Sequence, residues 1–375
     1  MCKEITPQEL GLLPENEIMI IDIRDRVSFE YGHIPGAVNI PQGELTPDKL
    51  PPDKLAVICC KIGLISRETA ESLSENGINA VSLAGGYLEW LRINIEKRDL
   101  TADVELSLRK KFKKNIWCRF TKAINEYKLV NPGDRIAVCI SGGKDSMLMA
   151  KLFQELKRHD KFPFEVRFLV MDPGYSPANR RLIEENAASM SIPIEVFESD
   201  IFESVFNIEK NPCYICARMR RGYLYSRAKA LGCNKIALGH HFDDVIETIL
   251  MGMLYGGQVQ TMMPKLHSTN FEGMELIRPL YLVREADIKH WRDYNGLHFL
   301  QCACKFTETC SSCDQNGQTD SKRLEVKHLI AELKKVNPQV EKNIFRSVEN
   351  VNLSTVIAYK QHGEVHNFLD TYDDK

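Results

Sequence analysis

Long apolar runs are missing from this sequence. No segment approaches the roughly 18 uninterrupted apolar residues of a membrane-spanning helix. The first five residues, Met1-Cys2-Lys3-Glu4-Ile5, lack the charged-then-apolar profile of a signal peptide. Long low-complexity tracts and internal repeats are absent as well. We therefore expect a globular, soluble, cytoplasmic protein with no membrane partner.

The sequence also lacks a large net charge, since its formal charge is −2. Any surface that binds nucleic acid must then be local. At 375 residues the chain is too long for one ordinary hydrophobic core, so we expect two or three domains. Cysteine, by contrast, is abundant. The 12 cysteines are clustered, and in a reducing compartment this favours metal ligands or reactive thiols over disulfides.

The hydrophobic pattern divides the chain into four parts. Residues 1–97 alternate short β-rich runs with helical stretches, which predicts a small α/β domain. Residues 98–130 predict one long basic helix, because apolar residues recur at every fourth position: Leu108, Phe112, Ile116, Phe120 and Ile124. Residues 131–350 predict a larger α/β domain with parallel strands in "RIAVCI", "FEVRFLVM", "IPIEVF" and "NKIALG", and with a helix after Cys313. Residues 351–375 form a tail.

A strand followed by a glycine-rich turn opens the larger domain. The run "AVCISGGKDSML" places Ser141-Gly142-Gly143-Lys144-Asp145-Ser146 between a strand and a helix. Two glycines let backbone amides approach an anion at the helix N-terminus, while Lys144 adds a charge and the serines add hydroxyl groups. An ordinary strand–helix turn is the alternative, and the spacing is not that of a Walker A loop. In this context the hexapeptide resembles the PP-loop of ATP pyrophosphatases, which split ATP into AMP and pyrophosphate.

A later strand end, "LGHHFDDVIET", carries groups suited to a magnesium nucleotide. We predict that Gly239, His240 and Asp244 bind ATP and its Mg²⁺, and that Asp243 acts in catalysis. A helix N-cap accounts for one aspartate and not for the whole cluster.

Cysteines in the larger domain have metal-ligand spacing. Cys213 and Cys216 form a C-x-x-C pair, Cys302 follows later, and Cys310 with Cys313 forms a second pair. Three thiolates suit an iron–sulfur cluster with one open iron, whereas four would close a structural zinc site. Spacing alone leaves both open.

Four longer segments resemble the tRNA 2-thiocytidine synthetases, the TtcA family: "SLRKKFKKNIWCRFTKAINEYKLVNPGDRIAVCISGGKDS", "PCYICARMRRGYLY", "NKIALGHHFDDVIETILMGMLYGGQVQTMMPK" and "IRPLYLVREADI". The resemblance runs from about residue 105 to about residue 350. It implies a PP-loop, adenine nucleotide alpha hydrolase-like parallel sheet and a 4Fe-4S cluster held by Cys213, Cys216 and Cys302. This chain is richer in cysteine than the family pattern, so Cys304 is an alternative third ligand. Cys310 with Cys313 is a candidate zinc site or sulfur relay.

The N-terminal segments "MIIDIRDRVSFEYGHIPGAVNIP" and "LAGGYLEWL" resemble rhodanese domains. The expected active-site loop begins at Cys60, where converging amides stabilise a thiolate and cradle a persulfide. Cys59, on the preceding strand, is expected to point into the core. Ile65 stands where an arginine is usual, and Arg67 follows two residues later. An inactive rhodanese-like binding module is therefore the alternative to a sulfur-loading domain.

Basic residues predict a local RNA surface. Residues 105–128 hold eight basic side chains against two acidic ones, and "CARMRRGYLYSRAK" adds five more beside the first C-x-x-C pair. Tyr223 and Tyr225 are expected to stack on an unpaired base. Ordinary solvated helix faces are the alternative.

Together these features predict an ATP-dependent tRNA thiolase fused to its own sulfur donor. The resemblance implies that cytidine 32 of the anticodon loop attacks the α-phosphate of ATP through O2, with Lys144 neutralising phosphate charge. Sulfur on the open iron then attacks C2 and releases AMP. Cys60 would carry a persulfide from a cysteine desulfurase or another donor, at the high effective concentration that fusion gives. The family's tendency to dimerise suggests a homodimer. The alternatives are 2-thiouridine formation and a non-catalytic iron–sulfur or persulfide sensor that binds ATP and RNA.

Overall fold

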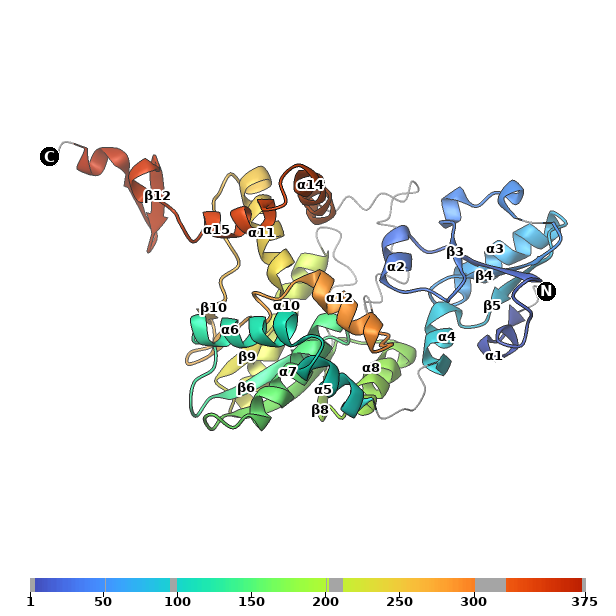
Figure 1. The fold of residues 1–375 in the computed structure, drawn as a ribbon, viewed down its shortest axis with the longest axis horizontal. Coiled ribbons are helices and arrows are strands. Elements are labelled where there is room, and N and C mark those ends of the chain that lie inside the picture. The colour runs from blue at the N-terminus through green and yellow to red at the C-terminus, as the bar shows by residue number, and fades with distance from the viewer. Residues whose placement is uncertain are drawn as a thin grey trace. The chain divides into compact units, whose positions relative to one another are not determined.

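The structure is a computed structural model that describes residues 4–50, 52–94, 100–199, 201, 212–300 and 322–372. The chain forms two compact units. The first comprises residues 1–242 and 264–320, and the second comprises residues 243–263 and 321–375. Two separate sheets follow one another along the first unit (Figure 1). None of the described helices is long and apolar enough to cross a membrane.

The N-terminal sheet, blue in Figure 1, is parallel throughout and has the strand order β1-β5-β4-β2-β3. Its core comes from alternate apolar residues of the central strands, such as Ile21 and Ile58, which pack with Ala70 and Leu73 of the helix that follows β4. The predicted small α/β fold is confirmed. Its elements are β1 (Glu4–Ile5), α1 (Pro7–Leu10), β2 (Ile18–Asp22), α2 (Arg26–Tyr31), β3 (Val38–Asn39), β4 (Leu55–Cys59), α3 (Leu64–Glu75), β5 (Ala80–Leu83) and α4 (Gly86–Asn94).

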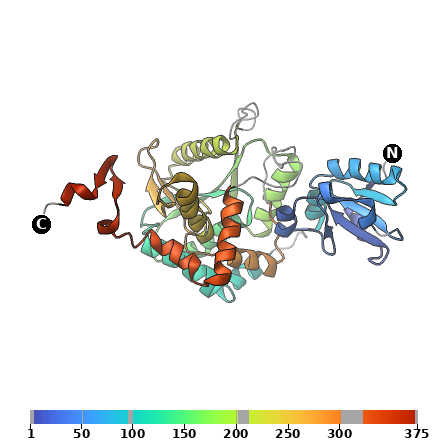
Figure 2. The same cartoon turned by 90° about the horizontal axis from the view of Figure 1, so that it is seen from above.

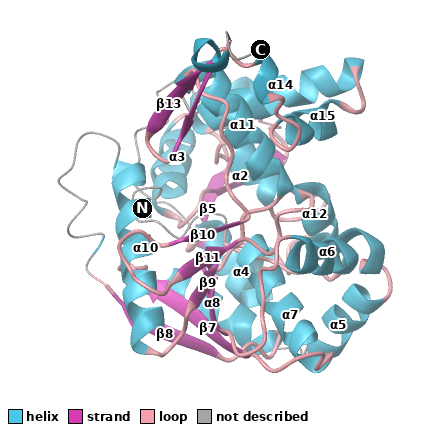
Figure 3. Cartoon of the chain, turned by 90° about the vertical axis from the view of Figure 1, so that its left-hand side faces the viewer, coloured by secondary structure: helices cyan, strands magenta, loops and turns pink. Residues whose placement is uncertain are grey.

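The second sheet has six strands in the order β10-β11-β9-β6-β7-β8, of which only the β10–β11 pair is antiparallel. Helices α7 and α10 lie on opposite faces of it (Figure 3). The four predicted parallel strands are β6 to β9, so this part of the fold is confirmed as well. The elements are β6 (Arg135–Ile140), α7 (Lys144–Arg158), β7 (Glu165–Asp172), α8 (Pro177–Ser189), β8 (Ile194–Glu198), α10 (Pro212–Ala230), β9 (Lys235–Ala237), β10 (Lys265–His267), β11 (Glu275–Ile277) and α12 (Glu285–Tyr294).

The strand order reverses beside β6. The next strand along the chain, β7, pairs on one side of β6, whereas β9 pairs on its other side. Open parallel sheets bind ligands outside the carboxyl ends of the strands at such a reversal. Since β6 leads into Ser141 and β9 leads into Gly239, the topology brings the two predicted nucleotide-binding segments together.

The single helix predicted for residues 98–130 is wrong. The chain instead forms α5 (Thr101–Arg109), a break at Lys110, one π-helical turn η3 (Lys113–Trp117) and α6 (Cys118–Glu126). In a straight α-helix, each residue lies about 40° around the axis from the residue four positions earlier. The five apolar residues would therefore not share one face. The break and the wider turn, in which the Trp117 amide donates to the Phe112 carbonyl (3.3 Å), absorb this rotation. All five residues are consequently buried.

The second unit is mostly helical. It contains α11 (Phe242–Gly256) from its second residue onward, α14 (Lys322–Val336), α15 (Val340–Ser347) and a hairpin of β12 (Ala358–Gln361) and β13 (Glu364–Asn367), the last two coloured red in Figure 2. Helix α14 confirms the helix predicted after Cys313. Arg323 of α14 joins Asp244 (2.9 Å) and Glu247 (3.6 Å) of α11 in ion pairs.

Candidate active site

The predicted phosphate loop is a tight turn between β6 and α7. Gly142 has φ +82°, and a Cβ there would lie 2.6 Å from Cγ1 of Ile183, so the position requires glycine. Ser146 Oγ donates to the Gly143 carbonyl (3.0 Å) and accepts from the Ser141 amide (3.1 Å), which fixes the turn. Gly143 is the N-cap of α7, a helix of 15 residues. Backbone amides at the N-terminus of such a helix form a ready anion site.

Lys144 and Asp145 bring charge to this turn. Lys144 is buried, and its Nζ lies 3.0 Å from Oδ2 of Asp145 and 3.3 Å from Oε1 of Glu285, the first residue of α12. The other Asp145 oxygen, Oδ1, is buried and accepts no hydrogen bond from the described residues. A buried carboxylate oxygen of this kind fits a site that receives a cation or a ligand hydroxyl group.

The segment after β9 lies against the phosphate loop. A Cβ on Gly239 would lie 3.3 Å from the Ser146 backbone nitrogen. Nε2 of His241 lies 3.9 Å from Oδ1 of Asp145. His240 is the residue between Gly239 and His241 in the chain. Glycine at 239 therefore permits the close approach of the two strand ends.

Asp243, predicted to act in catalysis, and Asp244, predicted to bind the magnesium nucleotide, occupy the first turn of α11, in the second unit. Asp244 is engaged by Arg323 through Oδ1 at 2.9 Å. Among the residues that the structure describes, no three His, Cys, Asp or Glu side chains form a metal-binding group. The catalytic role of Asp243 and the nucleotide-binding role of Asp244 stay predictions.

The predicted cluster ligands are only partly described. Cys302, Cys304, Cys310 and Cys313 fall within residues 301–321, outside the described residues. Cys213 and Cys216 are the second and fifth residues of α10, about one helical turn apart, and their side chains are not described. The chemistry of a three-thiolate donor set fits an iron–sulfur cluster with an open iron. The ligand set stays a prediction.

Cys60 follows β4 directly, and its loop ends at the N-terminus of α3. The Gly63 amide donates to Cys60 Sγ at 3.1 Å. Gly86 closes the back of the loop, since a Cβ there would lie 2.4 Å from the Cys60 carbonyl oxygen and 2.7 Å from the Gly63 nitrogen. A backbone amide that donates to the sulfur stabilises a thiolate or a persulfide anion. Cys59 is fully buried, and burial raises the pKa of its thiol well above the usual value.

The loop's usual arginine position holds Ile65, which is 41% exposed. Arg67 does not replace that arginine, because its Nη2 turns to Oε2 of Glu4 at 3.6 Å. The cation within the loop sequence is Lys61. The Cys60 loop thus keeps a backbone amide on the sulfur but has one fewer positive charge than the rhodanese pattern.

The predicted basic surface is partly neutralised. Arg109, Arg119 and Lys122 form ion pairs with Glu155, Asp287 and Glu126, respectively. Lys110, Lys113 and Lys114 are exposed around the π-helical turn. The expectation for Tyr225 is wrong, because its ring is buried and stacks on Phe271 at a centroid distance of 5.2 Å. Tyr223 is 37% exposed.

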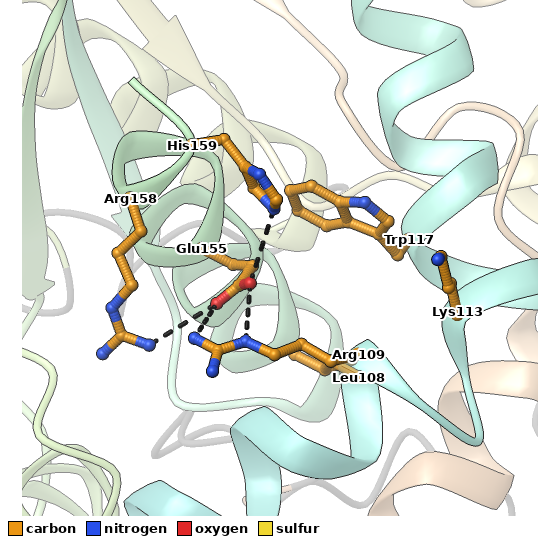
Figure 4. Close-up of a pocket in the computed structure, with 7 residues that line it drawn as sticks. All are labelled: Leu108, Arg109, Lys113, Trp117, Glu155, Arg158 and His159. Carbon is orange, nitrogen blue, oxygen red and sulfur yellow. Dashed lines mark hydrogen bonds and ion pairs between the residues drawn. The ribbon is translucent and has the colours of Figure 1, made fainter. Parts of the chain in front are cut away.

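A pocket of about 360 Å³ opens beside this turn (Figure 4). Arg109 makes a two-pronged contact to Glu155, with both N–O distances 2.7 Å. Trp117 stacks on His159 with a centroid distance of 5.1 Å and an interplanar angle of 28°. The pocket therefore combines an aromatic ring with three basic groups around one carboxylate. It is lined by Leu108, Arg109, Lys113, Trp117, Glu155, Arg158 and His159.

Two residues near the phosphate loop carried too little sequence signal to be predicted. Glu285 lies within "LVREADI", a segment quoted for its resemblance, but nothing in the sequence linked it to Lys144. Tyr31 belongs to the N-terminal domain, yet its ring centroid lies 5.7 Å from Lys144 Nζ. A contact across 113 positions of sequence leaves no periodic pattern that could predict it.

Comparison with known proteins identifies a family for each of the two sheet-containing domains. The PP-loop domain family matches residues 112–305, and the rhodanese-like domain family matches residues 6–93. A tRNA-cytidine(32) 2-sulfurtransferase from Coxiella burnetii is 35% identical over 246 residues, which are 64% of this chain and 90% of that protein. One from Geotalea daltonii is 36% identical over 242 residues, with 64% and 92% covered. The solved U34-tRNA thiolase NcsA from Methanococcus maripaludis with its 4Fe-4S cluster has 21% identity and TM-score 0.48, covering 62% of this chain and 76% of that one.

Proposed function

Because this chain belongs to the PP-loop family of ATP-dependent tRNA sulfurtransferases, we propose that it forms 2-thiocytidine at position 32 of tRNA, with its rhodanese domain as the sulfur donor. The observation that carries the proposal is the presence of two complementary sites in one chain. One is a phosphate loop at the strand-order reversal of the second sheet. The other is a cysteine whose sulfur accepts a hydrogen bond from a backbone amide. The place of action would be the cytoplasm, with tRNA as the partner.

The reaction would begin with activation of the base. O2 of the cytidine attacks the α-phosphorus of ATP, and pyrophosphate leaves with the electron pair of the broken P–O bond. Amides at the start of α7 and the Lys144 ammonium would stabilise the charge that develops on the phosphates. Asp145, with its buried Oδ1, would bind Mg²⁺ on the nucleotide. The predicted roles of Asp243 in catalysis and of Asp244 in binding the magnesium nucleotide are part of this proposal.

Sulfur then replaces the adenylated oxygen. Delivered at the oxidation level of sulfide, it attacks C2, and AMP leaves with the former O2. Cys60 would supply this sulfur from a persulfide, whose terminal atom is at the sulfane level. Its transfer as sulfide takes two electrons from a thiol reductant and returns Cys60 to the thiolate.

Cys213, Cys216 and Cys302 would hold a 4Fe-4S cluster. When bound, the cluster would supply an iron with an open position that can hold sulfur. Cys304 is the alternative third ligand, and Cys310 with Cys313 would bind zinc or relay sulfur.

The tRNA surface would include the exposed lysines of the π-helical turn and the pocket beside Trp117 (Figure 4). Lysine and arginine side chains neutralise backbone phosphates. The exposed Tyr223 would offer a face on which an unpaired base can stack.

The test is anaerobic purification with iron and zinc analysis, followed by an assay with ATP, Mg²⁺, a persulfide donor and unmodified tRNA. Nucleosides are identified by mass spectrometry, with Cys60→Ala, Cys213→Ala and the exposed control Cys118→Ser beside the wild type. We expect 2-thiocytidine with the wild type and Cys118→Ser, none with Cys213→Ala, and a loss with Cys60→Ala that added sulfide restores.

Each other outcome removes a defined part of the proposal. A product of 2-thiouridine would correct the base. Purified protein that contains zinc and no iron would contradict the proposed iron–sulfur cluster. Absence of pyrophosphate release with tRNA would leave a sensor that binds ATP and RNA.

A further inference from the structure

Tyr31, the last residue of α2, joins the rhodanese domain to the phosphate loop. Its hydroxyl donates to the carbonyl of Leu300 at 3.1 Å, and its own carbonyl accepts from Nη1 of Arg292 at 2.6 Å. The Tyr31 hydroxyl oxygen also lies 4.0 Å from where a Cβ on Gly143 would stand. A residue of the N-terminal domain therefore forms part of the wall around a loop from the other domain.

The tyrosine is fixed from both sides. Within its own domain, Arg24 pairs with the buried Asp22 (2.5 Å) and donates to the Gly32 carbonyl (2.7 Å), which anchors the end of α2. From the other domain, the Arg292 guanidinium lies 5.4 Å from the centre of the Tyr31 ring. Burial raises the pKa of Tyr31, so the hydroxyl stays protonated and able to donate.

Tyr31 faces the two features on which the proposed chemistry depends. The first is Lys144, whose ammonium lies within cation–π distance of the ring at 5.7 Å. The second is Leu300, whose carbonyl oxygen lies 3.5 Å from the Cβ position of Gly143 and which stands two residues before Cys302 in the chain. One aromatic side chain thus contacts the phosphate-loop cation and the segment that leads to the predicted third cluster ligand.

We propose that Tyr31 is a positioning residue through which the rhodanese domain completes the ATP site. Its ring orients Lys144 and shields it from water, and its hydroxyl holds the Leu300 carbonyl against Gly143. This inference rests on the proposed function, since it assumes that the loop binds ATP. Because coupling between two sites is reciprocal, nucleotide binding would also strengthen the docking of the domain that carries Cys60.

The test measures binding of a non-hydrolysable ATP analogue to the full chain by calorimetry, without tRNA. We expect Tyr31→Ala to weaken binding about tenfold, the size of a partly desolvated cation–π contact. Tyr31→Phe keeps the ring and should stay within about threefold of the wild type. Arg26→Ala, on the same helix but paired with Glu44 inside the rhodanese domain, is the matched control and should bind as the wild type does. In pyrophosphate release, Tyr31→Ala should raise KM for ATP more than it lowers kcat.

Thermal unfolding of each variant separates misfolding from loss of the contact, and Tyr31→Phe, which keeps the ring, separates the effect of the ring from that of the hydroxyl. Unchanged or tighter binding by Tyr31→Ala would overturn the inference and leave the proposed function intact. An equal loss in Tyr31→Phe and Tyr31→Ala would assign the effect to the hydroxyl and overturn the role of the ring. If the wild type does not bind the analogue, both the proposed function and this inference fail.

Discussion

Lys144 of the phosphate loop lies between two carboxylates, 3.0 Å from Asp145 and 3.3 Å from Glu285. Burial alone would lower the pKa of Lys144, but the negative charges of the Asp145 and Glu285 carboxylates outweigh it and raise that pKa. A raised lysine pKa contributes stability that is fully present below the ordinary lysine value and lost only as pH rises through the higher one. The lysine is therefore charged wherever the enzyme works. In the proposed site, ATP would have to compete with two carboxylates for it.

This competition predicts the effect of Glu285→Gln. Removing one of the two carboxylates leaves Lys144 more available to phosphate, so the ATP analogue should bind about three- to tenfold more tightly in the absence of Mg²⁺. Calorimetry without Mg²⁺ measures this. Glu332→Gln, an exposed carboxylate of α14 paired with Lys335, is the control and should change nothing. Weaker binding by Glu285→Gln would mean that Glu285 acts on the nucleotide itself.

Gly142→Ala should abolish pyrophosphate release and lower stability. The backbone at φ +82° costs an alanine about 1–2 kcal/mol, and its Cβ would also collide with Ile183 at 2.6 Å. Gly133→Ala is the matched control, because Gly133 has φ +83° but no atom within 4 Å of its Cβ position. Urea unfolding should show the backbone cost in both variants, with a further loss and inactivity in Gly142→Ala alone. Equal stability of the two variants would contradict the collision.

Local signals in the sequence predicted the two sheets and both loops. The strands at 135–140 and 55–59 are short β-rich runs that end in Gly-containing turns, and such runs specify strands through burial whatever lies around them. The same holds for Cys60, whose place after a strand depends only on neighbours in sequence.

The features that the sequence did not predict depend on contacts between residues far apart in the chain. The row from Leu108 to Ile124 has a helical period, but keeping all five side chains buried required a π turn that no local propensity encodes. Tyr225 has the residue type of a stacking platform, yet Phe271 covers its ring. Tyr31 reaches the phosphate loop only because two domains pack together.

Ile65→Arg should increase sulfur transfer by the rhodanese domain. Position 65 is in the first turn of α3, next to the Cys60 loop, so an added cation there stabilises the attacking thiolate and the persulfide. The rate of thiosulfate-to-cyanide transfer should rise severalfold. Leu64→Arg places the same charge on the neighbouring residue, which is 63% exposed, and should have a smaller effect. If both variants act alike, the charge works by general attraction of the anionic substrate.

Lys113→Ala and Lys114→Ala should each weaken tRNA binding and reduce the slope of log K against log salt by about one. Both lysines are exposed on the π-helical turn. Lys360→Ala, exposed on the C-terminal hairpin, is the control with an equal loss of charge. Filter binding over a range of salt concentrations measures the slope. An unchanged slope for the turn variants would exclude this surface from tRNA binding.

His298, which lies where the rhodanese domain contacts the PP-loop domain, should make the free energy of unfolding depend on pH. Burial, assisted by the charge of Arg292, lowers the pKa of His298, whose ring meets Trp90 of α4 edge-on at 6.4 Å. The folded state therefore favours neutral His298, while the unfolded chain takes up a proton near its ordinary value of 6.5. Stability is full above that value and declines as pH falls below it, because the unfolded state binds more protons. Urea unfolding at about pH 5.5 and about pH 7.5 should show this loss in the wild type and a smaller one in His298→Gln. An identical loss in His298→Gln would assign the acid sensitivity to other groups.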